Sequence, residues 1–145
     1  MKIIFDYNRT IFDPENDCLY NGVFEVLQTL DRNNDLFLVS RNESERKTRL
    51  KSLGIEDLFE KILFIGSKSE DSFLSLVGNI TEVIVVGDSI HDEIRIGNRL
   101  GFTTVRLLQG KFGNVIPSIA EEIPDYEIKD IRELINIVKN YEKQN

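Results

Sequence analysis

The chain has a single cysteine, no tryptophan and no apolar run near the roughly 20 residues that a membrane-spanning helix needs. Cys18 cannot form a disulfide within the chain, which favours a reducing compartment. The opening residues, MKIIFD, lack the extended apolar segment and the small-residue cleavage site of a secretory signal. These absences predict a cytoplasmic protein with no membrane role.

Basic residues are also outnumbered, because 18 lysines and arginines stand against 25 aspartates and glutamates, for a formal net charge of -7. Phosphate backbones attract basic surfaces, so this balance argues against a nucleic-acid partner. A small anionic substrate would need a local positive group. The 145 residues, 41% of them hydrophobic, can bury a core of their own, and we expect residues 1–145 to form one domain.

Short apolar runs alternate with segments of helical periodicity along most of the chain. Bounded runs rich in branched or aromatic residues predict buried strands at 2–5, 36–39, 62–65, 83–86 and 103–107. Apolar residues three and four positions apart predict helices at 22–32, 43–52, 70–77 and 92–100. A short strand at 126–128 and a helix from 130 to about 141 follow. The order predicts an α/β fold of three αβα layers, with a Rossmann-like, doubly wound parallel sheet of about five strands.

Polar side chains stand where the predicted strands end, which is where doubly wound sheets bind ligands. Asp6 ends the first strand and Ser40 the second. Asp88 follows the fourth strand, with Asp92 shortly after it. Lys68 precedes the helix that leads into that strand. We therefore expect three carboxylates, a hydroxyl and an ammonium group at one edge of the sheet.

Each of these residues also has a simpler explanation as a helix cap. Asp88 could cap the helix that begins near Asp92, and Ser40 could cap a helix that begins near Glu43. A cap needs one side chain, however, whereas Asp6, Asp88 and Asp92 together would repel one another and raise a carboxylate pKa. Magnesium would remove that conflict, because it prefers a few carboxylate oxygens, a backbone carbonyl and waters. The acidic set predicts a Mg²⁺ site.

These segments, taken in order, resemble the motifs of the haloacid dehalogenase-like (HAD) superfamily of phosphohydrolases. The first motif of that superfamily is an apolar strand that ends in Asp-x-Asp-x-Thr. The matching residues are Asp6 and Thr10 in IIFDYNRT, Ser40 in LFLVS for the second motif, Lys68 in GSKSEDSFLSL for the third, and Asp88 and Asp92 in VIVVGDSIHDEIRIGNRLG for the fourth. The resemblance covers essentially the whole chain and implies one HAD-like catalytic domain.

The resemblance implies a magnesium-dependent phosphatase, of the phosphoric monoester hydrolase class, that works through an aspartyl-phosphate. Asp6 would be the nucleophile, and Lys68 would balance the carboxylates and hold phosphoryl oxygens. The substrate-binding residues would be Thr10, Ser40, Arg41 and Lys68. The metal would be held by Asp6, Asp88 and the backbone carbonyl of Asn8, with Asp92 orienting a metal-bound water. Phosphoryl transfer asks mainly for this kind of positioning and charge neutralisation.

Asn8 departs from the motif, because phosphatases of this superfamily usually carry there an aspartate that moves protons for the leaving oxygen and the attacking water. An amide does neither, and losing a general acid-base group typically costs roughly 10²–10⁴-fold in rate. Three alternatives remain open. The substrates could be activated esters or acyl phosphates, another group such as His91 could supply the proton, or the chain could be a noncatalytic phosphate-binding or protein-interaction module.

Arg9 and Arg41 follow the first and second motifs and are candidates to contact an anionic substrate. These two arginines and His91 also have plain structural explanations. His91 could be a surface residue in the first turn of a helix, and the two arginines could be solvated loop residues.

The chain has little room for a lid domain, since only residues 11–20 separate Thr10 from Gly22 and the interval from Ser40 to Lys68 is short. We expect no separate cap domain and an open site. An open site suits a bulky phosphorylated substrate, or a lid made by oligomerisation, and the sequence chooses neither a small molecule nor a macromolecule as substrate. Displacing a halide needs a dry pocket, so phosphoryl hydrolysis is favoured over dehalogenation.

Overall fold

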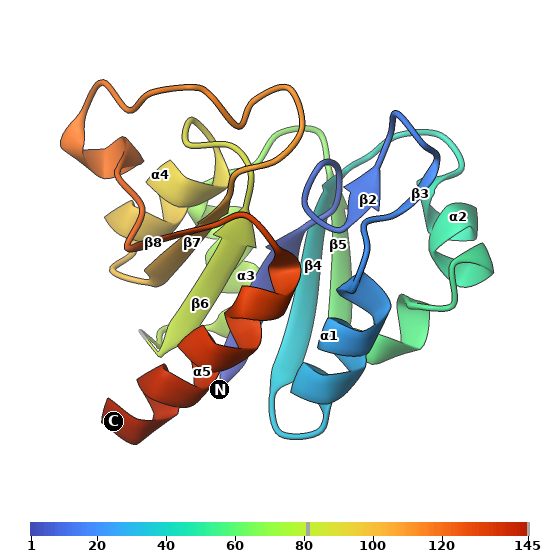
Figure 1. Ribbon diagram of the computed structural model, residues 1–145, viewed down its shortest axis with the longest axis horizontal. Helices are drawn as coiled ribbons and strands as arrows, with labels where there is room; N and C mark the ends of the chain where they lie inside the picture. Colours follow the sequence, from blue (N-terminus) through green and yellow to red (C-terminus); the bar gives the residue numbers. More distant parts are fainter. Residues whose placement is uncertain (81, 145) are drawn as a thin grey trace.

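A six-stranded parallel sheet forms the centre of the computed structural model, which describes residues 1–80 and 82–144 (Figure 1). The strands in sheet order are β5 (Lys61–Ile65), β4 (Asp35–Arg41), β1 (Lys2–Asp6), β6 (Val83–Gly87), β7 (Thr103–Leu107) and β8 (Tyr126–Ile128). Each neighbouring pair is parallel. The chain moves outward from β1 to β5, then crosses back to β6 and continues to β8. The direction of winding therefore reverses beside β1.

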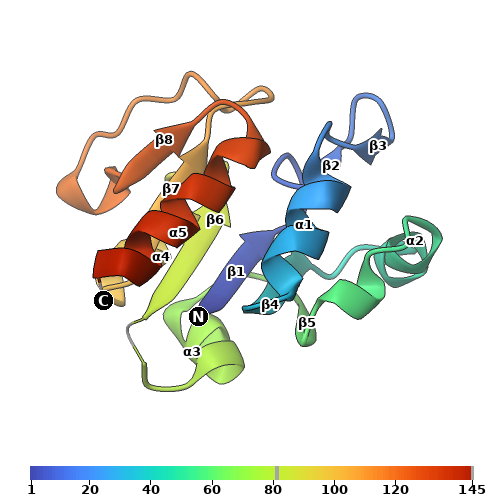
Figure 2. The ribbon, with the colours of Figure 1, turned by 60° about the horizontal axis from the view of Figure 1, so that its bottom comes forward.

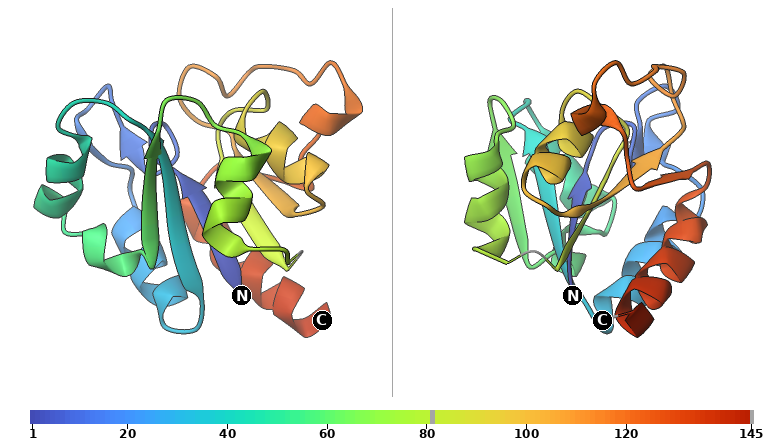
Figure 3. Two further views of the ribbon diagram at one scale, coloured as in Figure 1. Left: turned by 180° about the vertical axis from the view of Figure 1, so that it is seen from behind. Right: turned by 90° about the vertical axis from the view of Figure 1, so that its left-hand side faces the viewer.

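Helices cover both faces of the sheet (Figures 1 and 3). One face carries α1 (Val23–Asp31) and α5 (Leu134–Gln144), which lie side by side (Figure 2). The other carries α3 (Glu70–Val77) and α4 (Glu93–Arg99). Toward the β5 edge, α2 (Arg46–Ser52) packs on the α1 side. Short 3₁₀ turns are η1 (Glu56–Leu58), η2 (Ala120–Glu122) and η3 (Ile131–Glu133).

The strand periodicity divides the core into two layers. In β1, Ile3 and Phe5 pack toward α1 and α5, whereas Ile4 packs toward α3 and α4. Phe73 of α3 fills the centre of the second layer and is fully buried. Because β1 is covered on both faces, its carboxyl end is held rigidly by two apolar layers, which fixes the position of Asp6.

The predicted fold class is confirmed, and most predicted elements lie within one or two residues of their expected bounds. The sheet has six strands rather than about five, because β8 pairs with β7. Helix α2 begins at Arg46 instead of near residue 43, because β4 runs on to Arg41 and the Asn42 amide bonds the Ile65 carbonyl. Backbone that pairs in the sheet in this way cannot also start a helix.

The connection from β1 to α1 contains a small hairpin. It consists of β2 (Phe12–Asp13) and β3 (Cys18–Leu19), and the Asp13 carboxylate stabilises its turn by accepting from the Glu15 and Asn16 amides. Within residues 1–80 and 82–144 there is no separate cap domain, as predicted. No helix in these ranges has the length and apolar character to cross a bilayer.

Candidate active site

A pocket of about 430 Å³ lies at the carboxyl ends of β1, β4 and β6. It lies where the strand order reverses, the usual ligand position in a doubly wound sheet. The lining residues are Asp6, Asn8, Arg9, Arg41, Glu43, Arg46, Lys68, Asp88, Ser89, Ile90, His91, Asp92, Glu93, Phe112 and Val115. Strands far apart in the sequence thus bring most of the predicted site residues to one place.

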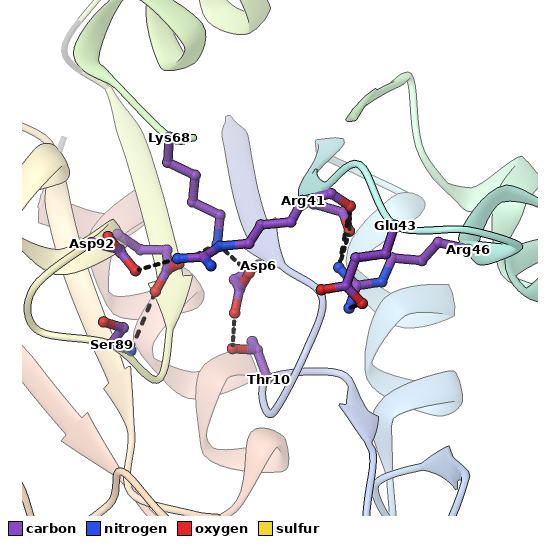
Figure 4. Close-up of polar contacts among 10 residues, drawn as sticks. Asp6, Thr10, Arg41, Glu43, Arg46, Lys68, Ser89 and Asp92 are labelled. Carbon is purple, nitrogen blue, oxygen red and sulfur yellow. Dashed lines mark hydrogen bonds and ion pairs between the residues drawn. The ribbon is translucent and has the colours of Figure 1, made fainter. Parts of the chain in front are cut away.

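Asp6, the last residue of β1, is buried at the base of this pocket and is held by two side chains (Figure 4). The Thr10 hydroxyl donates to Asp6 Oδ2 at 3.1 Å, because the backbone turns sharply after Tyr7 and brings residue 10 back beneath the strand. Lys68 Nζ donates to Asp6 Oδ1 and also to Glu93 Oε1. The carboxylate is therefore oriented before any ligand binds.

Three buried carboxylates share this position, namely Asp6, Asp88 and Glu93, each with an oxygen within 4.8 Å of the others. Among the described residues, Lys68 places one ammonium between Asp6 and Glu93, so ionising all three carboxylates would leave two negative charges uncompensated. Burial, followed by repulsion from Asp6 and Glu93, raises the pKa of Asp88 to about 8. Burial and the Asp6 charge likewise raise the pKa of Glu93 to about 7. The cluster would therefore carry unbalanced negative charge at pH values where all three carboxylates are ionised, unless a metal cation also binds.

Lys68 is held in its charged form by the same cluster. Burial alone would lower its pKa, but the Glu93 and Asp6 carboxylates outweigh burial and raise the pKa above the ordinary lysine value. A permanently charged ammonium beside Asp6 would attract an anionic group into the pocket.

The third carboxylate of the cluster is Glu93 and not Asp92, which corrects the sequence-based expectation. Asp92 is the residue before α4, its side chain is 42% exposed, and it pairs with Arg41 at 3.9 Å. Glu93 opens the helix on the face that also carries Ile96 and Gly97, and that face packs against the sheet. The signal was present in the sequence: Glu93 has apolar or small residues three and four positions later.

Gly87 makes the inward position of Glu93 feasible. A Cβ at residue 87 would lie 2.7 Å from Glu93 Oε2 and 2.9 Å from Glu93 Cβ, closer than side chains pack. The Ser89 amide donates to the same Oε2 at 3.2 Å. The sequence GDS therefore lets the start of α4 approach the end of β6 and places Glu93 beside Lys68.

Helix capping does not explain these polar residues. Asp92 precedes α4 and Glu45 precedes α2. Neither residue makes a side-chain capping hydrogen bond. Ser40 lies inside β4, where it is fully buried, and donates to the Arg41 carbonyl at 3.1 Å. The cap interpretation therefore fails for Ser40, and the buried carboxylates have no such structural role.

Arg46 is a site residue that sequence reasoning missed. Its guanidinium donates to Ser40 Oγ and to Glu43 Oε2, each at 2.8 Å, and Arg46 lies beside Glu43 in Figure 4. The guanidinium also lies 4.9 Å from the Tyr7 ring centre. It occupies the first turn of α2, where charged residues are usually solvated, so no pattern in the sequence marked it. Arg46 joins the ends of β1 and β4 and adds a positive charge to the pocket wall.

Asn8 and His91 line the same pocket. Asn8 is half-buried, two residues after Asp6, and pairs through its backbone with Phe12. His91 is 59% exposed, and its Nδ1 lies 2.6 Å from Glu122 Oε2 in the loop after β7. The Ser118 amide and hydroxyl hold the other Glu122 oxygen at 2.9 and 3.0 Å. His91 therefore contacts the segment between β7 and β8 and is also exposed at the pocket.

No family model matches the chain. The chain is 25% identical to the Bacillus subtilis protein YfnB, named as a HAD-hydrolase, over an alignment of 139 residues. The alignment covers 88% of this chain and 57% of YfnB. The crystal structure of YfnB bound to magnesium has a TM-score of 0.70 to this chain, at 25% identity, over 83% of this chain and 56% of the other. In sequence and in fold, the chain is therefore similar to a hydrolase of the haloacid dehalogenase-like superfamily.

Two further comparisons are with proteins named as a phosphatase and as a phosphoglucomutase. A segment of 62 residues is 39% identical to glyceraldehyde 3-phosphate phosphatase of Methanopyrus kandleri, over 43% of this chain and 27% of that protein. A Thermotoga maritima protein named as a beta-phosphoglucomutase is only 15% identical but has a TM-score of 0.78, over 96% and 98% of the two chains, and so shows the same fold. The chain spans about a quarter of the archaeal phosphatase and somewhat over half of YfnB.

Proposed function

We propose that this HAD-like chain is a cytoplasmic, magnesium-dependent phosphohydrolase that acts on phosphorylated substrates through an aspartyl-phosphate on Asp6. The observation that carries the proposal is the oriented Asp6 carboxylate, held by Thr10 and Lys68 at the base of a pocket. Relatives named as phosphatases support hydrolysis of a phosphate ester. Oriented carboxylates of this kind act as nucleophiles in phosphoryl transfer.

The residues present fit a magnesium ion. Three carboxylate oxygens within 4.8 Å of one another, with two uncompensated charges, are a donor set that a hard dication prefers. Asp6, Asp88 and the backbone carbonyl of Asn8 would hold the ion, and Glu93 takes the supporting place expected of Asp92. When bound, magnesium would neutralise charge on the carboxylates and on the phosphoryl group.

Asp6 would attack phosphorus as the bond to the leaving oxygen breaks, which gives the aspartyl-phosphate and the free alcohol or acid. A water would then attack the same phosphorus, releasing Asp6 and inorganic phosphate. Lys68 would hold phosphoryl oxygens. Ser40 is fully buried behind the pocket lining and accepts from Arg46, so its hydroxyl would reach those oxygens only after turning away from the Arg41 carbonyl. Thr10 keeps Asp6 oriented through both steps.

Asn8 would make this phosphohydrolase selective or slow. Its amide lines the pocket but can neither protonate a leaving oxygen nor deprotonate water, so both protons are exchanged with solvent. Acyl phosphates and activated esters need little help of this kind, because their leaving groups are stable anions. The alternative function, a noncatalytic phosphate-binding or protein-interaction module, is favoured by Asn8 alone.

The proposal is tested with acetyl phosphate, p-nitrophenyl phosphate and glycerol 3-phosphate, assayed with Mg²⁺ and with excess EDTA. We expect Mg²⁺-dependent phosphate release that is fastest for acetyl phosphate and slowest for glycerol 3-phosphate, since the leaving-group pKa rises in that order. Phosphate release that is absent from all three reactions would reject the phosphohydrolase and leave the binding-module alternative.

The pH dependence of stability offers an independent test of the metal site. Asp88 has an ordinary pKa near 3.8 when unfolded and about 8 when folded, so the folded protein holds that proton more tightly. Its contribution to stability is full below about pH 4 and is lost as the pH rises to about 8. We expect EDTA-treated protein to melt at a lower temperature at about pH 8 than at about pH 5.

Magnesium should reverse this loss and raise the melting temperature at about pH 8 by about 5–10 °C at saturation. Asp88→Asn should raise the melting temperature of the metal-free protein at that pH and remove the magnesium response. Asp92→Asn is the matched control, because the Asp92 side chain lies outside the cluster, and it should keep most of the response. A magnesium response lost in Asp92→Asn but kept in Asp88→Asn would contradict the assignment.

A further inference from the structure

Two arginines that line the pocket, Arg41 and Arg9, form only long ion pairs, each at 3.9 Å. Arg41 follows Ser40 at the end of β4, and 62% of its side chain is exposed. It reaches across the pocket to Asp92, which stands before α4 on the far side of β1, but the two charged groups remain 3.9 Å apart (Figure 4). An exposed pair at this separation contributes little to stability. Arg41 is therefore free to exchange Asp92 for another anion.

Arg9 is the second of these arginines, and its position is set by the surrounding backbone. It adopts a left-handed conformation with φ 61°, and the Gln109 side-chain amide donates to its carbonyl at 3.1 Å. Its guanidinium lies 5.4 Å from the Phe112 ring centre, and its Nε is buried without a hydrogen-bond partner among the described residues. Glu15, more than half exposed, is 3.9 Å away. Arg9 thus lines the pocket with its side chain held in place against Phe112 and with only a long ion pair to Glu15.

The other two cations of the pocket are already committed. Lys68 is bonded to Asp6 and Glu93, and Arg46 is bonded to Ser40 and Glu43. They complete the phosphoryl end of the site. Arg9 and Arg41 therefore stand apart from the proposed chemistry, on the outer wall of the same pocket, in a chain whose net charge is -7. Positive groups that line a pocket of an acidic protein are suited to a specific anion rather than to general attraction.

We propose that the substrate is a small phosphate monoester with a second anionic group, a carboxylate or another phosphate, which Arg41 and Arg9 bind while Asp6 faces the ester phosphorus. This inference rests on the proposed function for the identity of the reacting group. A guanidinium presents a planar fork of donors that matches both anions. Binding replaces the long Arg41–Asp92 pair by closer, charge-assisted hydrogen bonds, and Asp92 is the group displaced. Phe112 supports the Arg9 side chain during this exchange.

The experiment compares matched phosphonates that differ only in the second anion. 3-Phosphonopropionate and n-propylphosphonate have the same length, and their carbon–phosphorus bonds are not hydrolysed, so binding is measured without turnover. Calorimetric titration in excess Mg²⁺, repeated with homologues one and two methylenes longer, should give about 10- to 100-fold tighter binding of the carboxylated member for at least one length. Equal affinities at every length, or no phosphonate binding at all, would overturn the inference.

Variants assign the preference to the two arginines. Arg41→Gln and Arg9→Gln should each reduce the affinity ratio of the matched pair by about tenfold or more, and Asp92→Asn should increase it because the competing carboxylate is gone. Arg32→Gln, an exposed arginine at the end of α1, is the control and should leave the ratio unchanged. A ratio that persists in both Arg41→Gln and Arg9→Gln overturns the proposal.

Turnover separates this inference from the proposed function. 3-Phosphoglycerate and glycerol 3-phosphate are a hydrolysable pair that again differ mainly by a carboxylate. One outcome is that neither compound is hydrolysed, while the carboxylated phosphonate still binds more tightly and the variants lose that preference. This outcome would support binding of a second anion by Arg41 and Arg9 and would contradict the phosphohydrolase proposal. If both are hydrolysed with equal kcat/KM and the phosphonates also bind equally, the phosphohydrolase proposal is supported and binding of a second anion is contradicted.

Discussion

Asp6→Asn is expected to lower kcat for acetyl phosphate by about 10⁴-fold or more, the size of effect seen when a nucleophile is removed. The side chain keeps its shape, and its oxygen can still accept from Thr10 or Lys68, but an amide does not form the acyl phosphate. Removing one of three mutually repelling carboxylates should not lower the melting temperature of the metal-free protein. The rate loss would then be chemical in origin.

Asp35→Asn is the matched control for this loss. Asp35 is exposed at the amino-terminal end of β4, whereas the pocket lies at the carboxyl ends of the strands. Its substitution should leave kcat unchanged. Rapid acid quenching and mass spectrometry should detect a phosphorylated Asp6 peptide in the parent and none in Asp6→Asn. Parental rates in Asp6→Asn would remove the covalent mechanism from the account.

Asn8→Asp is expected to accelerate hydrolysis of glycerol 3-phosphate by roughly 10²–10⁴-fold, the usual contribution of a general acid-base group. Asn8 is half-buried in the pocket wall two residues beyond Asp6, so a carboxyl group there could carry protons to the leaving oxygen and from the attacking water. Acetyl phosphate, whose leaving group needs little protonation, should gain much less. The dependence of rate on leaving-group pKa should therefore become shallower.

Asn140→Asp adds the same charge on an exposed position of α5, and should change neither rate. Equal acceleration of both substrates by Asn8→Asp would mean that the new carboxylate acts through charge or metal binding instead of proton transfer. The result also bears on the open alternatives for Asn8. A large gain for poor leaving groups would show that the parent is limited by the missing acid, and that His91 does not supply it.

Local sequence determined much of this protein because its signals are short-range. Apolar runs and helical spacings located the strands and helices, since burial of one or both faces of an element leaves its period in the residues themselves. Asp6, Asp88 and Lys68 line one pocket because each lies next to the end of a predicted element, and the carboxyl ends of parallel strands meet on one side of the sheet.

Tertiary structure decided what depends on the rotation of helices and on contacts between distant segments. Asp92 and Glu93 are adjacent acids, and only the packing of α4 on the sheet turned the second inward and left the first to face Arg41. Arg46 lines the pocket because β4 extends to Arg41, beyond its apolar residues, so that α2 begins only at Arg46. One residue of helical phase is a rotation of about 100°, so a choice between neighbours is set by packing and not by spacing in the chain.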